Sequence, residues 1–255
     1  MSEMAKDAAK PVKKKNELVE TIVVIIEALA IALVFRTFLY QPFSIPTASM
    51  QSTLMIGDYF IANKWAYGFG KFSFPVPLPI NGRFLEFGEP QRGDIAVFHN
   101  VVTGEDYIKR VIGLPGERIQ VKEGRLYIND QLVERREIGT ANDTDSVMST
   151  VKVTVYEETL PNGVKHTIQE ISDNAPLDNT DVYTVPAGHY FMMGDNRDRS
   201  ADSRVLSQVG YVSKDQLIGK AEARFFSITN NLPPWQLWEW PANVRWDRMF
   251  QSVYQ

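Results

Sequence analysis

One long apolar segment near the N-terminus constrains this chain more than any other feature. From Leu18 to Tyr40 the sequence reads LVETIVVIIEALAIALVFRTFLY, and between Thr21 and Phe35 its one charged residue is Glu27. As a helix rising about 1.5 Å per residue, the segment is about 35 Å long, enough to cross a hydrocarbon core of about 30 Å. It has no polar face, so a buried helix of a soluble protein fits it poorly. Residues 17–40 are therefore predicted to form a single transmembrane helix.

The residues that flank this segment predict its orientation. A basic cluster, KPVKKK, occupies residues 10–15, and Arg36 lies near the other end with Phe38 and Tyr40. A cluster of lysines favours the cytoplasmic side, whereas the single Arg36 can extend to the far interface, where aromatic rings are also favoured. The sequence thus predicts a cytoplasmic basic tail (1–16) and an exported domain (41–255). A cleaved signal peptide is the alternative, although the apolar run continues beyond the usual length of such a region.

Beyond residue 40 the pattern changes to short runs of β-forming residues separated by turn signals. Ile95–Phe98, Arg118–Val121 and Arg125–Ile128 are such runs, and Glu123-Gly124 between the last two predicts a hairpin turn. The polar stretch 134–180 indicates a variable insertion, whose outer bounds we place at about 120–185. The predicted fold class is mainly β: one N-terminal transmembrane helix, then an exported β-rich domain with an inserted smaller β subdomain.

The C-terminal stretch LPPWQLWEWPANVRW holds four of the five tryptophans. Indole rings favour the headgroup region of a bilayer, so this stretch is a candidate membrane-contacting surface. A packed, partly exposed terminal strand or loop is the alternative, and the sequence does not decide between the two.

Composition excludes several kinds of site. The 255 residues include no cysteine, which rules out disulfides and a cysteine nucleophile, and the net charge of −4 gives no reason to expect nucleic acid as a partner. The three histidines, His99, His166 and His189, are scattered, and the zinc-protease string HExxH is absent. We therefore expect no metal and no cofactor, and we expect His166, beside Asn162-Gly163, to lie at the surface.

A serine and a lysine are left as candidates for nucleophilic chemistry. Ser49 follows Pro46 among small residues, and Lys109 lies in the apolar run YIKRVI. Burial disfavours the ammonium form, so a buried lysine can be neutral and act as a base. Yet serine-rich turns are common and a lysine in a strand usually faces solvent. These two segments alone leave the assignment open.

Four segments taken together resemble a known family. In chain order they are IPTASMQSTLMIGDY, RGDIAVF, DYIKRVIGLPGER and GDNRDRSADSR, all behind the single apolar segment. They resemble the ordered sequence boxes of bacterial type I signal peptidases, the leader peptidase family. The resemblance covers the anchor and most of the exported domain but not the insertion. Four ordered motifs with an anchor form a specific pattern, whereas each motif alone would be weak.

The resemblance implies a role for each matching residue. Ser49, just before Met50, corresponds to the nucleophile, and Lys109 to its general base. The Thr47 hydroxyl and the Ser49 N–H correspond to the oxyanion hole, and Ser200 to the serine that orients the lysine. Four charged positions look structural, and seven others are expected to line shallow substrate pockets. The structural set is Arg110, Asp195, Asp202 and Arg204; the pocket set is Phe43, Ile45, Pro46, Met50, Leu54, Tyr107 and Ile108.

The implied activity is removal of signal peptides from exported precursors, by cleavage after small residues at the bacterial inner membrane. The expected partners are signal peptides and the lipid bilayer, and the protein is expected to be monomeric. An inactive paralogue that binds signal peptides and a self-cleaving Ser/Lys peptidase remain as alternatives. Two residues depart from the family pattern: Ser52 replaces a proline, which predicts a looser turn, and Arg199 stands where asparagine is common.

Overall fold

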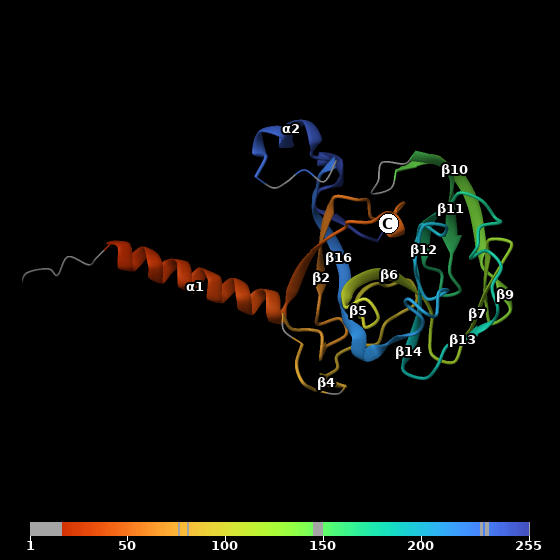
Figure 1. The fold of residues 1–255 in the computed structure, drawn as a ribbon, viewed down its shortest axis with the longest axis horizontal. Coiled ribbons are helices and arrows are strands. Elements are labelled where there is room, and N and C mark those ends of the chain that lie inside the picture. Colours follow the sequence, from red (N-terminus) through yellow and green to blue (C-terminus); the bar gives the residue numbers. More distant parts are fainter. Residues whose placement is uncertain are drawn as a thin grey trace, which may run out of the picture.

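The computed structural model describes residues 17–75, 77–80, 82–144, 150–229, 232 and 235–254. The helix α1 (Glu17–Phe38) projects from the β-rich body as an isolated rod (Figure 1). Its mean hydropathy reaches 2.6, none of its residues is buried, and it is the one helix of the described chain long and apolar enough to span a membrane. The apolar segment therefore forms the predicted helix, while the basic tail at 10–15 falls outside the described residues.

The junction between α1 and the body is held by a buried lysine. Strand β1 (Tyr40–Ser44) begins two residues after the helix ends. The Lys64 N–H donates to Leu39 O (3.1 Å), and Lys64 Nζ donates to Thr37 O (3.4 Å) and Ser73 O (2.5 Å). Because the last carbonyls of a helix have no intrahelical partner, a cation there stabilises the end of α1. Burial lowers the pKa of Lys64 to about 8.

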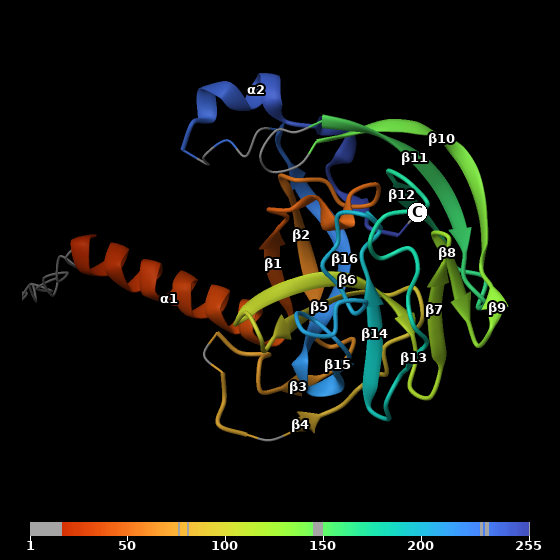
Figure 2. The ribbon, with the colours of Figure 1, turned by 45° about the vertical axis from the view of Figure 1, so that its right-hand side comes forward.

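The main sheet is antiparallel and runs in the order β1-β2-β16-β5-β6-β14-β15, so β1 is an edge strand (Figure 2). Strand β17 pairs with β16 outside this path. The bounds are β2 (Asp58–Asn63), β5 (Ile95–Asn100), β6 (Glu105–Gly113), β14 (His189–Met193), β15 (Val212–Ser213), β16 (Leu217–Ser227) and β17 (Gln251–Ser252). A small second sheet pairs β3 (Phe69–Gly70) with β4 (Arg83–Leu85).

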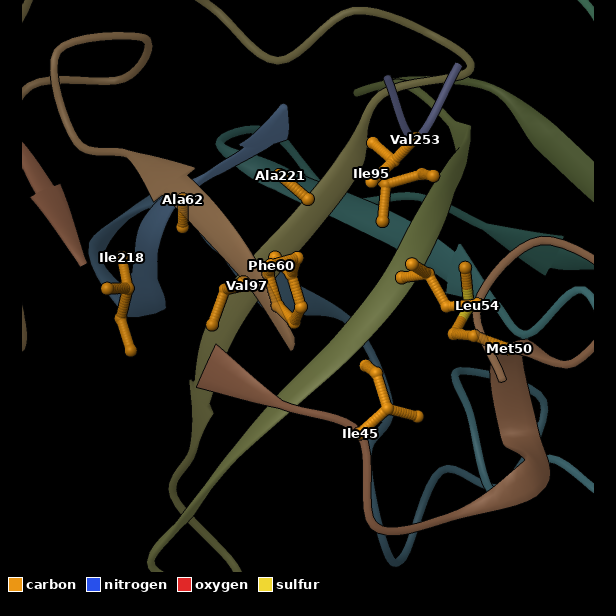
Figure 3. Packing of buried hydrophobic residues seen from close by; sticks show 10 residues of the cluster. All are labelled: Ile45, Met50, Leu54, Phe60, Ala62, Ile95, Val97, Ile218, Ala221 and Val253. Carbon is orange, nitrogen blue, oxygen red and sulfur yellow. The ribbon is translucent and has the colours of Figure 1, made fainter. Parts of the chain in front are cut away.

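Burial alternates from one residue to the next along β2, and the side chains on the buried face contribute to the first core. In β2 the buried residues are Asp58, Phe60 and Ala62, every second position, as a strand with one buried face requires. Figure 3 shows Phe60 beside Val97 in the middle of this core. Each Å² of apolar surface buried in this core contributes about 25 cal/mol to the stability of the fold. The buried members are Ile45, Met50, Leu54, Phe60, Ala62, Ile95, Val97, Ile218, Ala221 and Val253.

The insertion forms two further sheets. One has the order β13-β7-β8-β9, with β7 (Arg118–Lys122), β8 (Arg125–Ile128), β9 (Gln131–Leu132) and β13 (Tyr183–Thr184); the other has β10 (Glu134–Thr144), β11 (Thr150–Thr159) and β12 (Lys165–Glu170). Glu123 and Gly124 have φ of 48° and 68°, as a type I′ hairpin turn requires. Figure 2 shows β10 and β11 as a long curved hairpin. The predicted mainly-β fold with an inserted β subdomain is confirmed.

The prediction that His166 lies at the surface is wrong. This residue lies on β12 and is 6% exposed, with Nε2 3.4 Å from Glu158 Oε2. Burial lowers its pKa to about 3. The polar composition of the insertion suggested exposure, but β12 packs against the loop that follows β14: the Gln169 N–H donates to Asp195 O (2.9 Å). A polar sequence can thus be buried when its charges pair, as Glu158 does with Arg197.

The tryptophan-rich stretch forms short helices, including α2 (Trp240–Asn243), rather than a strand. Trp235, Trp238 and Trp246 are 72%, 74% and 64% exposed. Trp240 instead packs on Phe226, with ring centroids 4.9 Å apart. Contact of the exposed rings with lipid stays a prediction.

Candidate active site

Ser49 lies in a short 3₁₀ turn (Ala48–Met50) that follows the extended Thr47. The Gln51 N–H donates to Ala48 O (3.0 Å) and the Leu54 N–H donates to Met50 O (2.8 Å). Met50 has no exposed surface and anchors the turn in the first core. The Ser49 side chain therefore leaves a turn that is fixed by hydrogen bonds and by packing.

Lys109 reaches this serine from β6. Its Nζ lies 2.7 Å from Ser49 Oγ and donates to Ile108 O (3.0 Å), and the residue is only 4% exposed. Burial lowers the pKa of Lys109 to about 8, although the carboxylates of Asp202 and Asp195 act to raise it. The lysine therefore faces Ser49 rather than solvent. A neutral amine at this distance can accept the serine proton.

The expected oxyanion donors lie next to this pair. Thr47 Oγ1 is 3.4 Å from Ser49 Oγ. The Ser49 N–H donates to no other described residue, so it is available to a ligand. Ser200 is buried, but in the described part of the chain the hydrogen bonds of Lys109 go to Ser49 and Ile108 rather than to Ser200. A role for Ser200 in orienting the lysine stays a prediction.

The four charged residues expected to be structural form two buried ion pairs. Arg110 donates from Nε to Asp195 Oδ1 (2.8 Å) and from Nη2 to Asp195 Oδ2 (2.7 Å), and the Thr53 hydroxyl adds a third bond (2.6 Å). Burial acts to raise the pKa of Asp195, but the Arg110 guanidinium outweighs it and lowers the pKa. This pair ties β6 to the loop that follows β14.

The second pair, with a backbone hydrogen bond, connects residues within that same loop. Arg204 donates from Nε to Asp202 Oδ1 (2.9 Å) and from Nη2 to Asp202 Oδ2 (2.9 Å). The Gly194 N–H donates to Asp202 Oδ2 (3.0 Å). Burial acts to raise the pKa of Asp202, and Arg204 lowers it overall. Both carboxylates are therefore charged, and both act to raise the pKa of Lys109 against the larger effect of its burial.

Gly194 should tolerate no side chain. A Cβ there would lie 2.2 Å from Ser200 Oγ and 2.4 Å from Ser49 O. We expect Gly194→Ala to abolish cleavage and to lower the free energy of unfolding by about 1–3 kcal/mol, because the nucleophile turn must move. Gly163→Ala is the control for backbone strain without a clash, since Gly163 has a φ of 84° and its Cβ would meet nothing within 4 Å; it should keep cleaving. An active Gly194→Ala enzyme in a cleavage assay would contradict this geometry.

A cleft of about 290 Å³ opens beside Ser49. Of the seven predicted pocket residues, Phe43, Pro46, Tyr107 and Ile108 line it. Ile45, Met50 and Leu54 are at most 2% exposed and are members of the first core. The full lining is Phe43, Ser44, Pro46, Thr47, Ser49, Phe60, Val97, Glu105, Asp106, Tyr107, Ile108, Lys109, Arg199 and Ala201.

Sequence reasoning missed Phe60 and Val97, which reach the cleft through strand register. Phe43 pairs with Phe60 across β1 and β2, with stacked rings 5.7 Å apart. Val97 pairs with Ile108 across β5 and β6. Cross-strand neighbours project on the same face of a sheet. The correct register of the neighbouring strands would have identified both residues.

The turn after Ser49 has a backbone conformation that proline cannot adopt. Ser52 has a φ of 89°, which a proline ring fixed near −65° cannot adopt. The Ser52 hydroxyl donates to Thr167 O on β12 (2.9 Å). The insertion therefore contacts the residue at which the sequence predicts a looser turn, and the looser turn itself stays a prediction.

Comparisons with known proteins agree with the four motifs. The sequence model of the family described as signal peptidase, peptidase S26, matches residues 18–226. Signal peptidase I of Rickettsia typhi is 39% identical over 249 residues, which cover 89% of this chain and 90% of that protein. Signal peptidase I of Rickettsia akari is 38% identical over 252 residues, with the same coverage of both proteins.

A crystal structure of a signal peptidase I from Enterococcus faecalis is 29% identical in sequence and covers 52% of this chain and 96% of that one, with a TM-score of 0.31. The family match spans most of the chain, and the two Rickettsia enzymes align over nearly their whole length. With its apolar helix, ordered motifs and buried serine–lysine pair, the chain belongs to the signal peptidase family, peptidase S26.

Proposed function

We propose that this membrane-anchored peptidase cleaves signal peptides with Ser49 as nucleophile and Lys109 as general base. Removal of signal peptides by a serine peptidase follows from membership of the family. One observation carries the assignment of the residues: Lys109 Nζ is buried 2.7 Å from Ser49 Oγ. Burial disfavours the ammonium form, so a neutral lysine is accessible near neutral pH.

The proposed reaction proceeds through an acyl-enzyme. Neutral Lys109 accepts the proton of Ser49 as its oxygen attacks the scissile carbonyl. The Ser49 N–H and the Thr47 hydroxyl donate to the resulting oxyanion, each contributing about 3 kcal/mol to the stability of the transition state. Protonated Lys109 then gives its proton to the leaving amine, and water hydrolyses the ester.

The shape of the cleft supports cleavage after small residues in an extended substrate. Phe43 and Ser44 of the edge strand β1 line the cleft. Because an edge strand has unpaired backbone groups, an extended peptide can pair with it. Bulky residues fill the walls, namely Phe43, Phe60, Val97, Tyr107 and Ile108. Side chains as small as alanine at the first and third positions before the cut fit such shallow pockets.

The anchor supports a membrane-bound substrate. The lysines at 10–15 favour a cytoplasmic N-terminus, which places the catalytic domain on the exported side. A signal peptide in the same bilayer is then confined close to the enzyme, which raises its effective concentration. The expected substrates are exported precursors whose apolar segments lie in that membrane.

Cleavage of a purified precursor tests the proposal. In detergent, the wild-type protein should cut the precursor after a small residue, as located by mass spectrometry. Ser49→Ala should lose at least about 10³-fold in rate, because the nucleophile is gone. The exposed Ser252→Ala variant is the control. Unchanged cleavage by Ser49→Ala would refute the nucleophile, and no cleavage by the wild type would favour an inactive, signal-peptide-binding paralogue.

A further inference from the structure

The Ser49 N–H has a fixed direction because the carbonyl at the opposite edge of the same peptide group, Ala48 O, is held by a hydrogen bond. The carbonyl of Ala48 and the N–H of Ser49 belong to one trans peptide plane and point in opposite directions. Asn196 Nδ2 donates to Ala48 O (3.1 Å), and the Asn196 N–H donates to Ser49 O (3.2 Å). Asn196 thus contacts the carbonyls of two successive peptide groups and orients the Ser49 N–H.

Asn196 is itself oriented by the insertion. Its Nδ2 also donates to Asp143 Oδ2 (3.0 Å), and Asp143 lies on β10 with no exposed surface. An amide nitrogen has two hydrogens, so one can go to Ala48 O and the other to Asp143. Because a carboxylate only accepts hydrogen bonds, it selects the amide orientation in which nitrogen faces the nucleophile turn. Asn196 Oδ1 is buried without a hydrogen-bond partner in the described chain, so it does not set that orientation.

We infer that Asp143 is a positioning residue for the oxyanion hole, acting through Asn196. The inference rests on the proposed function, because it takes the Ser49 N–H as an oxyanion donor. It gives the inserted β10–β11 hairpin a part in catalysis although none of its described residues lines the cleft. The carboxylate orients the amide, the amide holds Ala48 O, and the Ser49 N–H points away from that carbonyl.

A second contact of Asp143 offers a competing role. Its Oδ2 lies 3.2 Å from Arg199 Nη1, and Arg199 lines the cleft. Asp143 could therefore act through this ion pair instead of through Asn196. The two roles differ in what they need: the ion pair needs the charge, whereas Asn196 needs only an acceptor oxygen. Asp143→Asn removes the charge that the ion pair needs and keeps the acceptor oxygen that Asn196 needs.

Steady-state kinetics on a signal-peptide substrate separate these roles. We expect Asp143→Ala to lower kcat by about 10–100-fold, as misplacing one oxyanion donor does, with KM and the pH midpoint unchanged. A peptide aldehyde, whose hemiacetal oxygen occupies the oxyanion position, should bind more weakly by the same factor. Asp143→Asn should stay within about threefold of wild type. The neighbouring exposed Asn142→Ala is the matched control.

Two outcomes would overturn the inference. Asp143→Ala with unchanged kcat would show that the contact has no catalytic effect, and equal losses in Asp143→Ala and Asp143→Asn would assign the effect to Arg199. Amide hydrogen exchange gives a readout that needs no substrate: residues 48–54 should exchange at least about tenfold faster in Asp143→Ala, and other strands at the wild-type rate. Unchanged exchange in residues 48–54 would overturn the inference whether or not the wild-type protein cleaves a precursor. Absence of cleavage by the wild-type protein would instead refute the proposed function.

Discussion

Replacing Lys109 by methionine should give a protein that no longer cleaves precursor but is more stable than the wild type. Methionine fills a similar volume without an amine, so the proton of Ser49 has no acceptor and the rate should fall by about 10³-fold or more. The fold lowers the pKa of Lys109 from 10.5 to about 8. Below pH 8 the folded state therefore carries a disfavoured ammonium group, and removing it should raise the free energy of unfolding by on the order of 1–3 kcal/mol.

The sign of the pH dependence gives an independent check on this base. The unfolded chain binds more protons at Lys109 than the fold does between pH 8 and 10.5, so this group makes the wild type more stable as pH rises through that window. Activity should rise with pH around a midpoint near 8, because only the neutral amine accepts a proton. Lys122→Met, at an exposed lysine of β7, should change neither property. Full activity at pH 6, or a cleaving Lys109→Met enzyme, would exclude the lysine as base.

Asp195→Asn should be the most destabilising neutral exchange near the site. It leaves the Arg110 guanidinium, 2% exposed, without a countercharge, and breaking a buried pair in this way lowers the free energy of unfolding by about 3–5 kcal/mol. Asp130→Asn is the matched control, because Asp130 pairs with Arg118 at 2.8 Å while both side chains are more than half exposed. An exposed pair contributes less than about 1 kcal/mol. Chemical unfolding in detergent measures both variants.

A double variant shows whether charge or packing is responsible. Arg110→Met with Asp195→Leu removes both charges and keeps apolar volume, so it should recover much of the lost stability. Equal, small effects of Asp195→Asn and Asp130→Asn would mean that water reaches the Arg110–Asp195 pair, contrary to its burial.

The sequence indicated the candidate serine and lysine but not the residues that support them. Ser49 and Lys109 could be proposed because composition removes cysteine and weakens histidine, and because four ordered motifs match one family. Their burial and their 2.7 Å contact required the fold, since they come from a turn and a strand far apart in the chain. Asn196 lies inside a recognised motif, yet nothing in its neighbours indicates that its amide holds Ala48.

The burial of residues that the sequence suggested would be accessible has a common physical cause. Ile45, Met50 and Leu54 were expected at the pocket because they surround Ser49 in sequence, and the structure buries them in the first core. His166 was placed at the surface because its neighbours are polar, but β12 packs against the Asp195 loop. Local composition predicts the exposure of a residue from its own segment alone, without the tertiary contacts of that segment. Tertiary contacts then decide which face of the segment is buried.

The junction between the helix and the first strand also sets a length scale. A single residue, Leu39, separates α1 from β1, and Lys64 holds both sides of this joint. Phe43 of the cleft lies five residues beyond the end of the helix, a span of about 17 Å at about 3.3 Å per residue. We expect the anchor to fix the distance between the membrane and the cleft. We therefore expect precursors to be distinguished by how far their scissile bond stands from the membrane as well as by the residues around it.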